Sequence, residues 1–157
     1  MFPPARSIKP PFTYVYGMYI SIAGVVAAVE NTVVLRVLAR KDQRRIKSNK
    51  LLMSLVVSDM LFGCMGIPDA YILFDSGPIP SENEIIFFSV VHVILVYLLF
   101  VTLLSMVIIS YDRYLLIAKY KDYNKLMTEK KVRCMIVGSW MAALVMLGVE
   151  LCIGVCS

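Results

Sequence analysis

The stretch SMVIISYDRYLLIAKY, residues 105–120, decides the fold of this chain. It closes an apolar run without Asp, Glu, Lys or Arg from Ile85 to Tyr111, and the run ends in the adjacent charges of Asp112 and Arg113. An isolated charge is costly in a low dielectric, so adjacent opposite charges at such a boundary neutralise each other or pair with a neighbouring helix. The same pattern also fits an ordinary helix end in water, and the rest of the chain decides between the two.

The composition of the 157 residues indicates a membrane protein. Hydrophobic residues make up 59% and charged residues 17%, whereas soluble domains have about 45–50% apolar and about 25% charged residues. The apolar residues gather in four blocks, roughly 12–38, 51–74, 85–118 and 134–155. Each block is near or above the roughly 20 residues that a helix needs to cross about 30 Å of hydrocarbon. We therefore expect an all-α membrane protein with four transmembrane helices, at about 12–39, 50–74, 84–118 and 130–156.

The placement of charge predicts how these helices are oriented. The connections after the first and third blocks are rich in Lys and Arg, whereas the connection 75–84 has neither. Basic connections stay in the cytoplasm, so residues 1–11 form a short extracellular tail and residues 12–157 the transmembrane bundle portion. The net charge of +5 does not indicate nucleic-acid binding, because the basic residues have no soluble domain to sit on.

Polar side chains inside the blocks indicate contacts between helices. Asp59 lies in the middle of the second block, where insertion of a carboxylate costs roughly 2.5–3.5 kcal/mol. It therefore needs partners, either in a functional site or in a structural polar clamp. Glu30 and Asn31 should face other helices rather than lipid for the same reason. Trp140, the only tryptophan, indicates a fixed helix–helix contact whose indole N–H needs an acceptor.

The sequence offers no pattern for catalysis or for a metal site. It shows no nucleophile beside a base, and neither its four cysteines nor its single His92 has metal-ligand spacing. Four residues recur at helical spacing, Leu95, Leu99, Thr102 and Met106, which fits helix packing better than a ligand box.

The polar residues follow one another in a recognisable order. Asn31, Asp59, Asp112-Arg113-Tyr114 and Trp140 fall one to each successive block, in the frames ENTVVLRVL, NKLLMSLVVSD and SMVIISYDRYLLI for the first three. This order resembles the signature residues of the first four helices of rhodopsin-like (class A) G-protein-coupled receptors. The resemblance covers essentially the whole chain but only four of the family's seven helices. It implies four transmembrane helices of an incomplete seven-helix receptor bundle with an extracellular N-terminus.

The resemblance implies a receptor rather than an enzyme, one that passes a signal from an unknown extracellular ligand across the lipid bilayer to a heterotrimeric G protein. It implies that Arg113 pairs with Asp112 in the inactive state and is released to the G protein on activation. Tyr114, Leu116 and Ile117 would line the coupling surface.

The resemblance also implies two sites within the bundle. Asp59, with Asn31 and Thr102, would form a polar core that holds a sodium ion in the inactive state of many relatives. The candidate ligand-facing positions lie on the outer halves of the second and third helices: Asp69, His92, Leu95, Val96 and Leu99. Leu95 sits where amine receptors place an aspartate, which argues against a biogenic-amine ligand.

Within the family, the Glu30-Asn31 pair resembles the branch of melanocortin, cannabinoid and sphingolipid receptors. The run from Tyr123 to Trp140 looks most like the melanocortin group. The family's usual cysteine at the start of the third helix would fall at Phe88, so its disulfide is absent, as in that branch. The melanocortin acidic partners on that helix would fall at Phe88 and His92, so the group's peptide and calcium site does not carry over.

The length of the chain leaves two further function classes open. The family's fifth to seventh helices have no counterpart in these 157 residues, so we expect a fragment or a truncated product. A truncated product could act as a non-signalling interaction partner or dominant-negative of full-length receptors. A transporter subunit or membrane enzyme is the other alternative, and the lack of an inverted repeat and of catalytic pairs argues against it.

Overall fold

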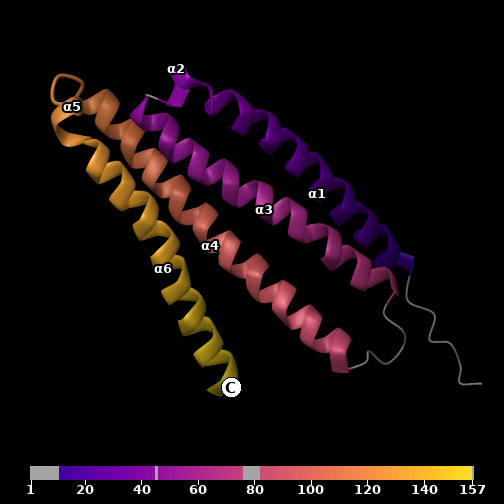
Figure 1. The fold of residues 1–157 in the computed structure, drawn as a ribbon. Helices are drawn as coiled ribbons and strands as arrows, with labels where there is room; N and C mark the ends of the chain where they lie inside the picture. The colour runs from indigo at the N-terminus through magenta and orange to yellow at the C-terminus, as the bar shows by residue number, and fades with distance from the viewer. Residues whose placement is uncertain (1–10, 45, 76–81, 157) are drawn as a thin grey trace, which may run out of the picture.

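The computed structural model describes residues 11–44, 46–75 and 82–156, and four long helices make up most of them (Figure 1). These are α1 (Pro11–Leu38), α3 (Lys47–Asp75), α4 (Glu82–Ala118) and α6 (Glu129–Cys156). Each is long and apolar enough to cross a membrane. Two short helices, α2 (Lys41–Arg44) and α5 (Tyr123–Leu126), lie at the same end of the bundle. The predicted all-α architecture with four membrane-spanning helices is confirmed.

The helices differ from the expected ranges by only a few residues at their ends. The largest difference is at α3, which begins at Lys47 rather than near residue 50. Its first turn is polar, and the Asn49 side chain donates to the Gln43 carbonyl oxygen at 3.1 Å. Such a turn can extend beyond the hydrocarbon because water and neighbouring polar groups form hydrogen bonds with its free backbone N–H groups. Of the predicted extracellular tail, residues 1–10 lie outside the described part of the chain.

Helix α3 is the centre of the bundle, since it packs against α1, α4 and α6. Its contact with α1 brings two backbones together at Gly24 and Gly63. A Cβ atom built at Gly63 would lie 2.8 Å from the Gly24 carbonyl oxygen, and one at Gly24 would lie 2.9 Å from the Gly63 oxygen. Small residues permit this close approach between membrane helices, so α1 and α3 pack at a distance that larger side chains would prevent.

A buried apolar cluster holds the end of the bundle that carries α5. Leu51, Leu115, Met127 and Val132 contribute to it from α3, from α4, from the residue after α5 and from α6. Helix α6 begins beside this cluster, where the Thr128 hydroxyl accepts the Lys131 N–H at 3.3 Å and caps the helix. The connection between α4 and α6 is therefore anchored to the bundle.

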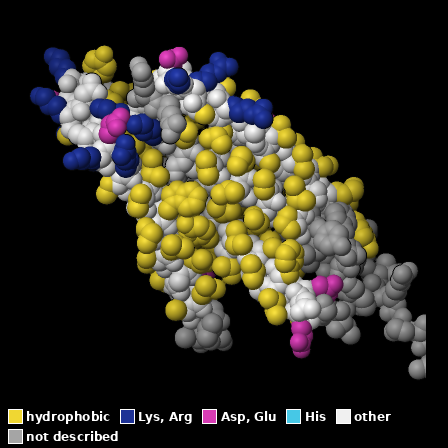
Figure 2. Space-filling view, viewed as in Figure 1, with side chains coloured by type: hydrophobic (Ala, Val, Ile, Leu, Met, Phe, Trp, Pro, Cys, Tyr) yellow, Lys and Arg dark blue, Asp and Glu magenta, His cyan; other side chains and the backbone are white. Residues whose placement is uncertain are grey.

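Side-chain chemistry divides the surface along the bundle axis (Figure 2). Apolar side chains cover the middle of the face shown, and the Lys and Arg side chains gather at the end that carries α2 and α5. Uncovered apolar side chains over the length of the helices suit contact with lipid or with further helices. The basic end is the one that the charge pattern places in the cytoplasm.

Candidate functional site

Asp112 of α4 is buried at the basic end of the bundle, with 1% of its surface exposed. The Ser48 hydroxyl of α3 donates to one carboxylate oxygen, and the Tyr123 hydroxyl of α5 donates to the other at 2.8 Å. Buried carboxylates persist in folded proteins when hydrogen bonds replace their water shell. Asp112 thus joins α3, α4 and α5 at one point.

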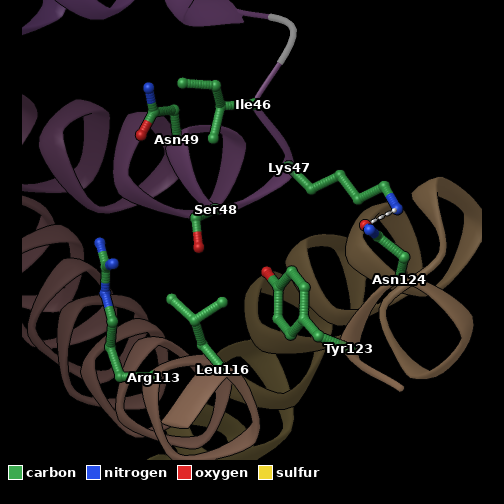
Figure 3. Close-up of a pocket in the computed structure, with 8 residues that line it drawn as sticks. All are labelled: Ile46, Lys47, Ser48, Asn49, Arg113, Leu116, Tyr123 and Asn124. Carbon is green, nitrogen blue, oxygen red and sulfur yellow. Dashed lines mark hydrogen bonds between the residues drawn. The ribbon is translucent and has the colours of Figure 1, made fainter. Parts of the chain in front are cut away.

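Arg113, the next residue, is exposed and lines an open pocket of about 340 Å³ (Figure 3). Arg113 and Leu116 lie on the α4 side of this pocket, across from Ser48 and Asn49 of α3. Asp112 and Arg113 do not form an ion pair in this structure: the carboxylate is held by Ser48 and Tyr123 instead. The inactive-state pairing implied by the family resemblance is therefore not the arrangement observed here.

The pKa of Tyr123 favours its role as a hydrogen-bond donor. Burial raises the pKa of the Tyr123 hydroxyl above its ordinary value; the nearby Ser48 hydroxyl lowers this pKa and the adjacent Asp112 carboxylate raises it. The hydroxyl therefore stays protonated at neutral pH and donates to Asp112.

Two polar contacts fix the connection between α4 and α6 to the start of α3. Lys47 donates to the Asn124 side-chain oxygen at 3.3 Å, and Lys50 pairs with Glu129 at 2.9 Å. Tyr114 and Ile117, the other predicted coupling residues, are 61% and 83% exposed. The basic end therefore combines an anchored connection with an exposed face of α4.

A second polar group lies in the membrane-spanning part of the bundle, between α3 and α4. The Thr102 hydroxyl donates to an Asp59 carboxylate oxygen at 2.7 Å and lies 3.1 Å from the hydroxyl of the buried Ser58. The Asn31 side chain instead donates to the Ala27 carbonyl oxygen of its own helix at 2.9 Å. Two of the three predicted core residues, Asp59 and Thr102, are thus bonded together, and Asn31 is not bonded to them.

Trp140 ties α6 to both neighbouring helices. Its indole N–H donates to the Ser54 hydroxyl of α3 at 3.0 Å. Tyr97 of α4 donates to the Trp140 carbonyl oxygen at 3.4 Å, and the two rings meet edge to face with centroids 6.2 Å apart. Ser54 is the acceptor that the sequence argument required for the indole.

A comparison of the chain with known proteins agrees with the order of the signature residues and with the four membrane spans. A family model described as the 7 transmembrane receptor (rhodopsin family) matches residues 30–155. The chain belongs to the rhodopsin family of seven-transmembrane receptors. It is therefore a multi-pass membrane protein.

This rhodopsin-family chain is also similar to a curated protein of Mizuhopecten yessoensis named "Rhodopsin, GQ-coupled". The two are 29% identical over 147 residues, which cover 92% of this chain and 28% of the relative. The chain thus spans less than a third of the length of the relative that it matches.

Four of the five ligand-facing candidates of this rhodopsin-family chain fall on the half of α4 away from the basic end, and Asp69 is on α3. His92 and Leu99 are exposed, and Leu95 and Val96 are half-buried. The Asp69 side chain lies outside the described residues. Glu30, expected to face another helix, is exposed on α1. The expected contact between Glu30 and another helix is absent among the described residues, because these four helices leave that face of α1 uncovered.

Sequence reasoning missed the partners that hold the signature residues in place. Ser48, Ser54 and Tyr123 bind Asp112 or Trp140, although none was proposed as a site residue. The sequence carried only a weak signal for the two serines, namely that α3 contains small polar residues that could face a polar group on a neighbouring helix. Only the rotation of α3 about its axis reveals which serines those are.

Proposed function

We propose that the chain is the four-helix portion of a G-protein-coupled receptor that passes an extracellular signal to a heterotrimeric G protein. The observation that supports it most is that the Asp112 carboxylate and the Arg113 guanidinium do not pair with each other at the basic end. Because Ser48 and Tyr123 satisfy the Asp112 carboxylate, the Arg113 guanidinium is left beside an open pocket. A planar guanidinium with five N–H donors suits recognition of carboxylate or carbonyl groups on a partner peptide.

The proposed coupling surface consists of this pocket and the adjoining exposed face of α4. Leu116 supplies an apolar wall beside Arg113, and Tyr114 and Ile117 present large exposed side chains on the same helix end. An exposed apolar surface beside a charged group is typical of a protein interface. The similarity to a relative named as Gq-coupled supports the Gq class as the partner.

In this proposal, an extracellular ligand shifts the bundle between two states that differ in affinity for the G protein. The ligand would contact α4 near His92, Leu95, Val96 and Leu99, together with Asp69 of α3. Leu95 in place of an acid disfavours a biogenic amine as this ligand. The Glu30-Asn31 pair supports the finer assignment to the melanocortin, cannabinoid and sphingolipid branch.

The polar core is proposed to bind a sodium ion. Asp59 supplies a carboxylate, and the hydroxyls of Thr102 and Ser58 lie within one hydrogen-bonded chain with it. Hard cations prefer such oxygen ligands. A cation there would offset the cost of an anionic side chain within the membrane.

The proposal is tested with Arg113→Ala in the receptor that carries these four helices together with its remaining ones. We expect agonist-stimulated nucleotide exchange on the G protein to fall to background while surface expression stays near wild type. The matched control is Arg133→Ala, since Arg133 is exposed at the same end and pairs with the exposed Glu129 at 3.8 Å. Normal exchange by the Arg113 variant would exclude this residue as the switch.

A further inference from the structure

A small cavity lies where α3, α4 and α6 meet, one helical turn along α4 from Thr102. Its volume is about 10 Å³. Each of the three helices contributes one serine to its lining, and apolar side chains complete the wall: Leu51, Ser54, Ser105, Ile108, Ile136 and Ser139. Three hydroxyls around one small space in a membrane-spanning region need an explanation, because apolar residues would pack there without polar cost.

Ser105 is the member of this group without a partner. The residue is 4% exposed, and its hydroxyl oxygen is the buried side-chain polar atom in the described part of the chain that makes no hydrogen bond. Buried hydroxyls in folded proteins are nearly always bonded to protein or to ordered water. Ser105 therefore indicates that a further polar group occupies the cavity.

The other two hydroxyls each have hydrogen-bonding capacity to spare. Ser139 donates to the Ile136 carbonyl oxygen at 2.7 Å, so its oxygen can still accept. Ser54 accepts the Trp140 indole N–H at 3.0 Å, so its own proton can still be donated. A hydroxyl carries one donor and two acceptor positions. The three serines thus offer a ligand both donors and acceptors.

We propose that one water molecule binds in this cavity and bridges Ser54, Ser105 and Ser139. A volume of about 10 Å³ is at the lower limit of what a cavity needs to hold one water and is too small for a second, and buried waters typically make about three hydrogen bonds. The water links α3, α4 and α6, and it orients the Ser54 hydroxyl that holds Trp140. It also extends the polar strip formed by Asp59, Thr102 and Ser58 toward α6.

Trp140 is the only tryptophan in the chain, so its indole N–H is a built-in reporter of the site. The full chain would be labelled with ¹⁵N at the indole, perdeuterated and placed in detergent micelles. A cross-relaxation peak between the indole proton and the water frequency is expected, with the sign of a slowly exchanging bound water. An absent peak would overturn the proposal, because the cavity would then be dry and Ser105 would bond to its own helix.

The Ser54 hydroxyl could relay the same peak by exchanging its proton with solvent, and variants at Ser105 separate the two sources. Ser105→Ala removes a partner of the water and Ser105→Val fills the cavity, while both keep Ser54. We expect both variants to lose the peak and to keep the indole chemical shift within the range of a hydrogen-bonded Trp. Ser110→Ala is the control: its exposed hydroxyl donates to the Met106 carbonyl oxygen of its own helix, and the peak should persist. A peak retained in both Ser105 variants would assign it to Ser54 and contradict a bound water.

Discussion

At the scale of single residues, the carboxylates of the buried Asp112 and the half-buried Asp59 are bonded to hydroxyls rather than to opposite charges. Asp112 is bonded to Ser48 and Tyr123, and Asp59 is bonded to Thr102. A hydroxyl partner avoids the desolvation cost that a second buried ion, such as Lys or Arg, would add. It also leaves Arg113 available at the pocket of the basic end.

Replacing Tyr123 with Phe tests the support of Asp112. The change leaves the ring in place and removes one of two hydrogen bonds to a buried carboxylate, so we expect a destabilisation of about 1–3 kcal/mol. Thermal unfolding of the chain in micelles would measure it. Tyr120→Phe is the matched control, because Tyr120 lies in the same connection and is 78% exposed; equal stability of the two variants would contradict the role of Tyr123.

The pH dependence of this contact follows from the raised pKa of Tyr123. The folded state holds the hydroxyl proton more tightly than the unfolded state, whose tyrosine pKa is about 10. The stabilisation is therefore fully present below about pH 10 and is lost as the pH rises through the higher folded-state pKa. Comparison of wild type with Tyr123→Phe between pH 7 and 11 should show a stability difference that narrows only at the alkaline end. A difference that narrows toward acidic pH would contradict this assignment.

At the scale of elements, α3 holds the other three long helices by two different kinds of contact. It meets α1 through backbone at Gly24 and Gly63, and it meets α4 and α6 through hydroxyls and the Trp140 indole. Close backbone packing depends on shape alone, whereas the polar contacts depend on the rotation of each helix. Both are needed because lipid supplies no hydrophobic force between helices.

The variant Gly63→Ala tests the backbone contact. Its methyl group would lie 2.8 Å from the Gly24 carbonyl oxygen and 3.1 Å from the Ala28 nitrogen, both atoms of rigid helix backbone. We expect a loss of about 1–3 kcal/mol from overpacking, read as a lower thermal midpoint. Gly148→Ala is the control, since a Cβ atom there meets nothing within 4 Å. An unchanged midpoint for Gly63→Ala would show that α1 and α3 do not pack this closely.

At the scale of the whole molecule, the distribution of charge predicts the orientation of the bundle in the membrane. The Lys and Arg side chains gather at the end formed by α2, α5 and the adjacent helix ends (Figure 2). By the positive-inside rule we expect this end in the cytoplasm, and the pocket that carries Arg113 lies at the same end.

Epitope tagging in cells expressing the chain would measure this orientation. A tag before Met1 should bind antibody on intact cells, because the N-terminus is expected outside. A tag inserted after Lys121, in the exposed connection between α4 and α5, should bind only after the membrane is permeabilised. The reverse pattern would place the Arg113 pocket outside the cell and remove the basis for G-protein coupling.

The sequence by itself determined the four membrane helices and the order of the signature residues, and it predicts the orientation of the helices, because each depends on composition and position along the chain. Only the tertiary structure decided which groups meet. Ser48 and Asp112 are 64 residues apart, Asp59 and Thr102 are 43 apart, and Ser54 and Trp140 are 86 apart. Such pairs depend on the rotation and axial shift of whole helices, and a hydrophobic pattern that is apolar on nearly every side does not specify either.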